Sequence, residues 1–422
     1  MGTGFTVRFN LAYGKSIVPI DVPSANLLGM LAPRPMESVD LPKAFAQAWA
    51  NPFGMKDPAA AFRPGETIAI VVTDHTRKTP TRLIFPLLWD RLKDRLDRDD
   101  VTLVVATGTH RASTDDELEK MLGDLRREFR VAVHNCDKDT VEIGRSARGT
   151  PILINRIVAE ADHVVTIGHV GMHYYAGYSG GRKNILPGVA GRATIEANHA
   201  QLSHPKSDAC IYEGNPISEE MVEAAKLVGV DFLVDVVLNS KGDVARIVIG
   251  ESEAAHAAAR SFWDEHAIVP VREKADRVIA SAGGPPKDID LYQAYKAQYT
   301  AARAVRDGGM IYLLAACPDG IGHRVFQDWM ERSAKPADVL CILEKEGFKL
   351  GGHKAVYHAK DLARLDVYLQ SELPLDLVCR FFYRAVTDPR EVLDEARRRF
   401  GPTHRILVMP YAGETFPVAH GA

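Results

Sequence analysis

The segment between residues 169 and 188 combines residue types that bind anions and move protons near neutral pH. It carries His169, His173, a glycine-rich loop at 177–181 and Lys183. Imidazole is the side chain that titrates near neutrality and serves as a general acid or base. His169 lies nearest the preceding predicted strand, so we expect a structural role for it and an acid-base role for His173. The mixture predicts a functional site.

Polar residues also follow two predicted strands earlier in the chain. Asp74 and Arg77 come after the strand at 67–72, and His110 follows the strand at 101–106 in the sequence Gly-Thr-His-Arg. Because ligands bind at the carboxyl ends of strands in doubly wound sheets, His110 is expected to be catalytic. Arg77 can bind a carboxylate with its planar fork, while Asp74 is equally compatible with a helix N-cap.

Two predicted helices carry further candidates. His199 is either a surface histidine or a ligand for nickel, copper, zinc or iron. On a later helix, Gln293 and Lys296 follow Tyr292 and stand three residues apart, a spacing that gives them one helix face. That face either binds a ligand or is simply solvated.

Lys183 follows a glycine-rich loop, as the lysine of a P-loop does. However, Arg182 stands where that motif requires glycine, and Asn184 stands where it requires serine or threonine. The sequence therefore disfavours a nucleotide triphosphatase.

The composition is that of an ordinary globular protein. Of its 422 residues, 46% are hydrophobic and 25% are charged, and the net charge of −3 gives no reason to expect nucleic acid or an anionic membrane as a partner. The five cysteines form no Cys-x-x-Cys pair, which disfavours a disulfide scaffold or a thiolate zinc site. No apolar run has the length of a membrane span, and the N-terminus lacks the apolar core of a signal peptide. We therefore expect a cytoplasmic protein.

Short β-branched runs alternate with segments of helical periodicity, which is the pattern of an α/β protein. Strands are expected at 5–11, 67–72, 101–106, 131–134, 164–167, 277–282, 310–314, 339–342 and 405–409. Helices are expected at 80–96, 114–129, 251–269, 291–306 and 325–332. Several strands are unbroken apolar runs, as in a parallel sheet covered on both faces. We predict two α/β domains with mostly parallel sheets, 1–270 and 271–422, and an active site in the cleft between them.

Taken together, these motifs resemble the nickel-dependent lactate racemase family of 2-hydroxyacid racemases and epimerases. The matching residues are Asp74, Arg77, Gly108, His110, Arg111, His173, Ser179, Gly180, Gly181, Arg182, Lys183, His199, Tyr292, Gln293 and Lys296. The resemblance implies a nickel-pincer nucleotide as cofactor, a pyridinium mononucleotide whose thioamide and thiocarboxylate arms clamp nickel. It also implies that the N-terminal domain anchors the cofactor and that the C-terminal domain contributes substrate-binding residues.

The resemblance implies a role for each matching residue. Lys183 resembles the lysine that binds the cofactor covalently through the thioamide, and His199 resembles the protein ligand of nickel. His110 and His173 resemble the paired acid-base histidines. The cofactor pocket is expected to include Asp74, Ser179, Gly180 and Gly181. The substrate-binding set is expected to be Arg77, Tyr292, Gln293 and Lys296.

The chemistry explains why such a site needs two histidines. A C2–H beside a carboxylate is a poor acid, because its carbanion would place negative charge next to an existing anion; removal of hydrogen as hydride avoids this. Inversion then requires a base on each face of the substrate, here His110 and His173. A nicotinamide-dependent dehydrogenase is the alternative enzyme, but no Gly-x-Gly-x-x-Gly follows the first strand. A nickel or nucleotide carrier would not need two bases.

Two additional arginines bear on the substrate. Lactate needs one carboxylate anchor, which Arg77 with Lys296 can supply, so Arg111 and Arg182 are not required for it. These two either contact phosphate or solvent, or bind a second carboxylate, as in malate, or a sugar acid such as gluconate. The family's late tryptophan has no counterpart at 345–360. We therefore expect malate or a sugar acid rather than lactate, with cofactor-synthesis enzymes as partners.

Overall fold

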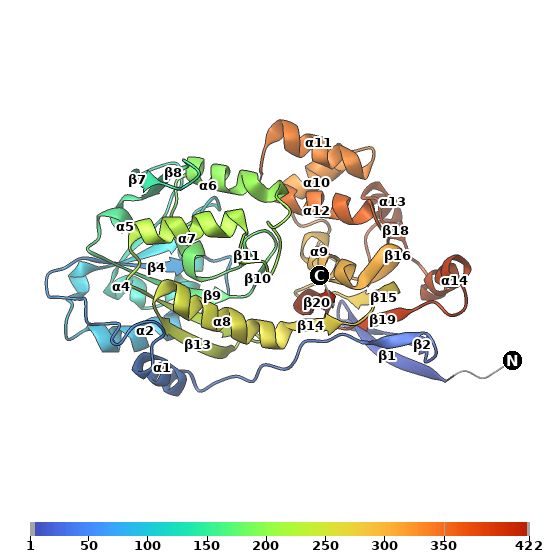
Figure 1. The fold of residues 1–422 in the computed structure, drawn as a ribbon, viewed down its shortest axis with the longest axis horizontal. Helices are drawn as coiled ribbons and strands as arrows, with labels where there is room; N and C mark the ends of the chain where they lie inside the picture. Colours follow the sequence, from blue (N-terminus) through green and yellow to red (C-terminus); the bar gives the residue numbers. More distant parts are fainter. Residues whose placement is uncertain (1–4, 350, 420–422) are drawn as a thin grey trace. The chain divides into compact units, whose positions relative to one another are not determined.

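Two compact units make up the protein, and each is built on a six-stranded sheet (Figure 1). The computed structural model describes residues 5–349 and 351–419. Pro35–Asp264 forms the central unit, and the segments up to Arg34 and from Glu265 onward form the terminal unit. This division differs from the expected domains, 1–270 and 271–422, chiefly in the segment before Pro35.

The N-terminal segment belongs to the terminal unit because its strands pair and pack there. β3 (Leu27–Met30) runs parallel to β19 (Ile406–Met409). The antiparallel hairpin of β1 (Thr6–Tyr13) and β2 (Ser16–Pro23) buries Leu11 against the same sheet. Pairing between segments so far apart in the sequence leaves no local periodicity to detect, so the expected boundary could not include it.

Five parallel strands and one antiparallel edge strand form the central sheet. Their spatial order is β13 (Val244–Gly250), β12 (Phe232–Leu238), β9 (His163–Val170), β4 (Ile68–Thr73), β5 (Val101–Ala106) and β6 (Arg130–Val133). The four strands expected between residues 67 and 167 are β4, β5, β6 and β9. β4 and β5 are almost wholly buried, which accounts for their unbroken apolar sequences.

Helices cover both faces of the central sheet (Figure 1). They are α1 (Leu41–Ala50), α2 (Thr81–Leu92), α3 (Asp115–Leu122), α4 (Leu125–Glu128), α5 (Arg156–Glu160), α6 (Arg192–His199), α7 (Pro216–Val228) and α8 (Ser252–Ala267). Val234 of β12 packs in the cluster with α1 and α2, whereas Leu233 packs with α8 on the opposite face. Two short hairpins complete the unit, β7 (Thr140–Arg145) with β8 (Pro151–Asn155) and β10 (Met172–His173) with β11 (Gly177–Tyr178).

The start of the helix expected at 114–129 is confirmed in detail. Thr114 caps α3 by accepting a hydrogen bond from the backbone N–H of Glu117 at 3.3 Å, and the Glu117 carboxylate accepts from the Thr114 N–H at 2.8 Å. This capping box is what Thr-Asp-Asp-Glu predicts. The single expected helix is two, however, because Gly123 has a φ of +56° and ends α3.

An all-parallel sheet forms the terminal unit. Its spatial order is β18 (Arg384–Ala385), β17 (Asp366–Gln370), β16 (Val305–Leu314), β15 (Ala275–Ser281), β19 and β3. A separate parallel pair joins β14 (Ile268–Val271) to β20 (Phe416–Ala419). The helices are α9 (Leu291–Ala304), α10 (Arg324–Glu331), α11 (Pro336–Glu346), α12 (Gly352–Leu362), α13 (Leu375–Arg380) and α14 (Pro389–Phe400). Val278 packs with α9, α10 and α12, whereas Ile279 packs with α14 and the hairpin on the opposite face.

The strand expected at 339–342 is wrong, because these residues lie in α11. Val339 and Ile342, three residues apart, are buried, and Cys341 between them is exposed, which is the spacing of a helix face. A run of four apolar residues cannot distinguish a strand from a helix turn. The flanking residues do distinguish them, since Pro336 occupies the first turn and Gly347 follows the end.

Two polar clusters outside the candidate site stabilise the units. At the amino edge of the central sheet, His163 lies between Asp231 (3.0 Å from Nδ1) and Glu66 (2.9 Å from Nε2). Burial lowers the pKa of His163, but these hydrogen bonds outweigh it, so the pKa is raised. In the terminal unit, buried Asp361 accepts from Tyr295 Oη and Gln298 Nε2, both at 3.1 Å, and burial raises the pKa of its carboxyl to about 7.

Among the described residues, no helix is both long and apolar enough to span a lipid bilayer.

Candidate active site

The loops that follow β4, β5 and β9 meet at the carboxyl edge of the central sheet. These three strands are neighbours and parallel, so their carboxyl ends lie at one edge. The Gly108 N–H after β5 donates to the Gly188 carbonyl at 2.9 Å, and Thr79 after β4 lies 2.9 Å from His169 Nδ1. The structure thus brings the predicted motifs of this unit together. The contact with Thr79 agrees with the structural role expected for His169.

Asp74 and His110 form a close polar pair between the loops that follow β4 and β5. Oδ2 of Asp74 lies 2.6 Å from Nδ1 of His110, and the carboxylate is only 2% exposed. Thr76 donates to the other oxygen, Oδ1, from its hydroxyl at 2.6 Å and from its backbone N–H at 3.2 Å. Burial raises the pKa of Asp74, but the hydrogen bonds from His110 and Thr76 outweigh it and lower the pKa.

This pair gives His110 a defined orientation. A carboxylate at Nδ1 fixes the proton on that nitrogen and leaves Nε2 as the basic atom. The sequence indicated a helix N-cap or a cofactor pocket for Asp74 and did not predict this contact. Asp74 follows β4 and His110 follows β5, so the two residues come together only because β4 and β5 are parallel neighbours in the sheet.

The glycine-rich turn before Lys183 depends on conformations that other residues rarely adopt. Gly180 has a φ of +77°, and a Cβ there would lie 2.6 Å from Val170 Cγ2 and 2.7 Å from Asp235 Oδ2. The Gly181 N–H donates to Asp235 Oδ2 at 2.8 Å. Ser179 Oγ donates to the His169 carbonyl at 3.0 Å. The turn is therefore fixed to the end of β9 and to the middle of β12.

Lys183 follows this turn in an environment that disfavours its charged form. Burial is the main reason that the pKa of Lys183 lies well below its ordinary value, and the charges of Arg77 and Arg182 lower it further. No carboxylate is among the groups that shift this pKa. A neutral amine is the nucleophilic form of lysine, so Lys183 is suited to covalent chemistry.

Tyr175 joins three of the predicted residues, and sequence reasoning missed it. Its buried ring lies edge-on to His173 at 4.5 Å and to His199 at 5.1 Å between centroids. The Nζ of Lys183 lies 5.8 Å from the centre of the same ring. His199 lies on a separate helix, far from Tyr175 in the sequence, so the tyrosine could not be distinguished from the other aromatic residues of the segment.

His199, the last residue of α6, is a neutral imidazole in a dry position. It is 3% exposed. Burial is the main cause that lowers the pKa of His199, to about 3. Neutral imidazole is the form that binds transition metals.

The described residues do not form a metal site by themselves. Among residues 5–349 and 351–419, no three His, Cys, Asp or Glu side chains are grouped to hold a metal ion. A metal bound at His199 would need its other ligands from a bound molecule. This matches the pincer cofactor that the sequence resemblance implies, because such a cofactor brings its own ligands and needs one imidazole from the protein.

The remaining predicted residues lie on α9 of the terminal unit. Tyr292 stacks on His323 at 4.7 Å, and Lys354 Nζ lies 3.6 Å from the centre of the Tyr292 ring and donates to the Tyr292 carbonyl. Gln293 lies in the first turn of the helix, where its N–H donates to the N-cap residue Asp290 at 2.6 Å. Lys296, one turn later, is exposed. Burial lowers the pKa of Lys354, and the positive charge of Lys296 lowers it further. Lys354 is a functional candidate that the sequence did not indicate.

The two arginines that suggested a second carboxylate anchor are held by the protein. Arg111 makes a bidentate ion pair with Glu117, at 2.5 and 2.7 Å. Arg182 is 1% exposed and donates to Ser218 Oγ at 2.8 Å and to the Ala176 carbonyl at 2.8 Å. Neither guanidinium needs a substrate carboxylate, which removes the argument on which the expectation of malate depended.

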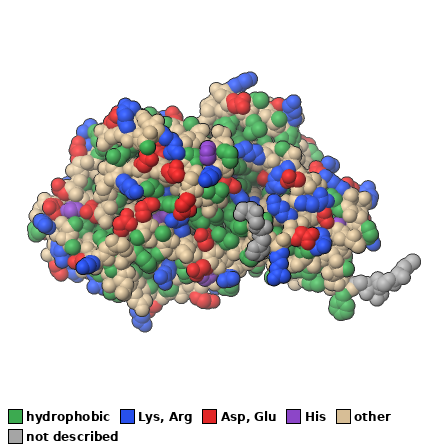
Figure 2. All heavy atoms as spheres, in the orientation of Figure 1, with side chains coloured by type: hydrophobic (Ala, Val, Ile, Leu, Met, Phe, Trp, Pro, Cys, Tyr) green, Lys and Arg blue, Asp and Glu red, His purple; other side chains and the backbone are tan. Residues whose placement is uncertain are grey.

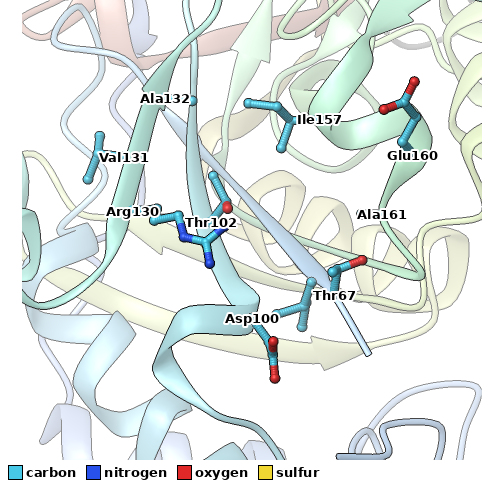
Figure 3. Close-up of a pocket in the computed structure, with 10 residues that line it drawn as sticks. Thr67, Asp100, Thr102, Arg130, Val131, Ala132, Ile157, Glu160 and Ala161 are labelled. Atoms are coloured by element: carbon cyan, nitrogen blue, oxygen red, sulfur yellow. The ribbon is translucent and has the colours of Figure 1, made fainter. Parts of the chain in front are cut away.

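A pocket of about 600 Å³ lies at the opposite, amino edge of the central sheet (Figure 3). Residues at the starts of β4, β5 and β6 line it together with α5, including Thr67, Asp100, Arg130 and Glu160. None of the predicted site residues lies there, so we do not associate this pocket with the chemistry.

Comparisons with known proteins match most of the chain. A family model described as the lactate racemase N-terminal domain matches residues 13–209, and one described as the lactate racemase C-terminal domain matches residues 271–410. A lactate racemase from Thermoanaerobacterium thermosaccharolyticum is 35% identical over 344 residues, 79% of this chain and 80% of that protein. One from Lactiplantibacillus plantarum is 28% identical over 422 residues, 96% of this chain and 98% of that protein.

Solved structures give the same result for the fold. The lactate racemase apoprotein from Thermoanaerobacterium thermosaccharolyticum superimposes with a TM-score of 0.89 at 31% identity, covering 98% of this chain and all of that one. A protein from Thermotoga maritima has a TM-score of 0.62 at 19% identity, covering 90% of this chain and 97% of its own, and supports the fold alone.

Proposed function

Because the chain belongs to the lactate racemase family and is therefore an isomerase, we propose that it inverts C2 of a 2-hydroxy acid by proton-coupled hydride transfer. The proposed cofactor is a nickel-pincer nucleotide bound covalently through Lys183. When bound, this group supplies the acceptor for the hydrogen on C2 and the remaining ligands of nickel.

One observation carries the proposal most directly, the grouping of Lys183, His173 and His199 around the Tyr175 ring. It combines a lysine whose pKa is lowered, a neutral imidazole suited to nickel and a histidine suited to proton transfer. A nucleotide carrier would have no use for a histidine suited to proton transfer. We propose that Ser179, Gly180 and Gly181 belong to the cofactor pocket, where their backbone can approach a nucleotide closely.

We assign proton transfer at the substrate hydroxyl to His110 and His173. His110 is supported as a base by its Nδ1 contact with Asp74, which leaves Nε2 to accept the hydroxyl proton. His173 would serve the other enantiomer. With one base for each face, the 2-keto acid formed in the reaction can receive hydrogen from either side.

The proposed substrate is a monocarboxylic 2-hydroxy acid, lactate or a sugar acid such as gluconate. Arg77 and Lys296 supply one carboxylate anchor, with Tyr292 and Gln293 completing the substrate-binding set. The engagement of Arg111 and Arg182 by protein partners supports one anchor rather than two. The reaction would take place in the cytoplasm, with cofactor-synthesis enzymes as partners.

The covalent anchor is the part of the proposal that is most easily tested. The protein should be produced together with cofactor-synthesis enzymes and its intact mass and nickel content measured. The wild type should carry a mass adduct and nickel, and Lys183→Ala should lose both together with racemisation. Lys226→Ala, which removes an exposed lysine near the end of α7 in the same unit, should keep them. An adduct that persists in Lys183→Ala would refute the assignment.

A substrate panel tests the second part. Single enantiomers of lactate, gluconate, malate and phenyllactate should be incubated with the nickel-loaded protein and followed by chiral chromatography. Lactate or gluconate should turn over fastest. Malate turning over fastest would contradict the single-anchor proposal and leave the racemase assignment intact.

A further inference from the structure

A buried arginine at the amino edge of the terminal sheet forms no ion pair with any residue that the structure describes. Arg277, near the start of β15, is 1% exposed, and its Nε and Nη1 make no hydrogen bond within the part of the chain that the structure describes. An unpaired buried charge costs several kcal/mol, so such groups are normally paired. Arg277 lies outside the candidate active site, whose α9 residues follow the other end of β15.

The carboxylate nearest in sequence is already committed to other partners. Asp276 accepts from Arg306 Nε at 2.5 Å and from the Arg405 N–H at 2.7 Å. Burial lowers the pKa of Arg277 to about 10, and only the Tyr312 hydroxyl acts against that shift. The guanidinium is therefore still charged at neutral pH.

A second buried polar side chain lies beside Arg277. His404 is 7% exposed and precedes β19, whose Ile406 pairs with Arg277. The backbone N–H of Arg277 also donates to the Arg405 carbonyl at 3.1 Å. Nδ1 of His404 donates to the Gly401 carbonyl at 2.8 Å, and Nε2 of His404 has no partner among the described residues. Burial is the main cause that lowers the pKa of His404; the charge of Arg277 lowers it further, and that of Asp276 raises it.

The two orphan groups have complementary hydrogen-bonding requirements. Arg277 offers donors and a positive charge, whereas Nε2 of neutral His404, with the proton on Nδ1, offers an acceptor. A chloride ion could satisfy the arginine but not the histidine. A compact oxyanion that retains a proton could satisfy both, because its oxygens accept from Arg277 and its hydroxyl donates to His404.

We propose that Arg277 and His404 form a binding site for a compact, proton-bearing oxyanion, hydrogenphosphate or bicarbonate. Three exposed arginines near the same sheet edge, Arg306, Arg399 and Arg405, are each paired with a carboxylate, of Asp276, Asp366 and Glu273 respectively, so an incoming anion is expected at Arg277 rather than at these three. Lys and Arg side chains also gather on the visible face of the terminal unit (Figure 2). The site is independent of the proposed racemase activity.

The test measures thermal unfolding of the full chain in increasing phosphate or bicarbonate, with ionic strength held constant by sodium chloride. A ligand that binds only the folded state stabilises it by mass action, so the wild-type midpoint should rise and then depend logarithmically on concentration. Arg277→Met, of similar length but uncharged, should show no rise. Arg405→Met removes an exposed arginine at the same edge with the same change in net charge, and it should respond like the wild type.

Further outcomes distinguish an oxyanion site at Arg277 from groups that ordered water satisfies. Without either oxyanion, Arg277→Met should unfold at the same or a higher temperature than the wild type, because it removes an unpaired buried charge. If this variant does not fold, phosphorus NMR of phosphate with the wild type and Arg405→Met should show line broadening in both. Equal responses of wild type and Arg277→Met would overturn the site. So would the absence of any response beyond sodium chloride, which would mean that ordered water satisfies these groups.

Discussion

Asp74 offers the sharpest test of the proposed acid-base chemistry, through the substitution Asp74→Asn. The Thr76 backbone N–H and hydroxyl both converge on Oδ1 of Asp74. A backbone N–H can only donate, so the carbonyl oxygen of the new amide should occupy that position. The amide NH2 would then face His110 Nδ1 and donate to it, which moves the imidazole proton to Nε2. His110 would present a donor where the reaction needs a base.

The size of the effect follows from the geometry. A hydrogen bond involving a charged group contributes about 1.5–3 kcal/mol, and each 1.4 kcal/mol is about tenfold in rate. The 2.6 Å contact and the 2% exposure of Asp74 place this pair at the upper end, because water cannot replace the lost partner. The wrong tautomer adds to this loss, as Asp-to-Asn substitution does in Ser-His-Asp hydrolases, at about 10⁴-fold. We expect a fall in kcat of about 10²–10⁴-fold.

The assay is racemisation of each enantiomer by protein loaded with cofactor, with nickel content and adduct mass measured on the same samples. Thr76→Val is the matched control. It removes the hydroxyl hydrogen bond to Asp74 Oδ1 but keeps the carboxylate that holds the proton on His110 Nδ1, so its rate should fall much less than that of Asp74→Asn. If Asp74→Asn, equally loaded, racemised as fast as Thr76→Val, the carboxylate would have no role in orienting the base.

Three further predictions concern stability, measured by urea unfolding. The pKa of His163 is raised by its two carboxylates, so the loss of stability in His163→Gln should be largest in acid and shrink as pH rises above about 6.5. The pKa of Asp361 is about 7 in the folded protein and about 4 in the unfolded chain. The free energy of unfolding of the wild type should therefore fall relative to that of Asp361→Asn, by up to about 4 kcal/mol, as pH rises from about 4 to 7. Parallel plots of unfolding free energy against pH for the two proteins would contradict this. Gly180→Ala should cost about 1–3 kcal/mol and slow adduct formation, because its Cβ would approach Asp235 within 2.7 Å. Gly65→Ala, at a φ of +85° with open space around it, measures the backbone strain alone.

The sequence predicted the elements whose environment is uniform along their length. β4 and β5 are buried on both faces, so their apolar runs could be recognised without knowledge of their neighbours. α11 was mistaken for a strand because the prediction used only its four central apolar residues and ignored Pro336 and Gly347 at its ends. β3 was missed for a different reason: it is a short strand whose pairing with β19 depends on residues far away in the sequence.

The candidate site shows a similar division between residue types and the contacts among them. Residue type and position in the sequence indicated His110, His173 and Lys183, because histidine and lysine are chemically distinctive. It could not indicate that Asp74 contacts His110, since that contact exists only because β4 and β5 are parallel neighbours in register. The argument that Arg111 and Arg182 provide a second carboxylate anchor failed for the same reason, because it used residue types without their contacts. A count of cations cannot reveal that Arg182 is buried and committed to hydrogen bonds with Ser218 and Ala176.

The fold also explains how the pKa of Lys183 can be lowered although the carboxyl group of Asp235 contacts the preceding turn. The turn at Gly180 needs a positive φ and rests on Asp235, whose pKa burial raises to about 7, so this carboxyl offers less than a full negative charge near neutral pH. Arg182 beyond it adds positive charge, which lowers the pKa of Lys183 together with burial. A fully ionised acid at the turn would act in the opposite direction and hold the amine in its protonated, unreactive form. The raised pKa of Asp235 and the lowered pKa of Lys183 therefore have a common origin in the exclusion of water from one short segment.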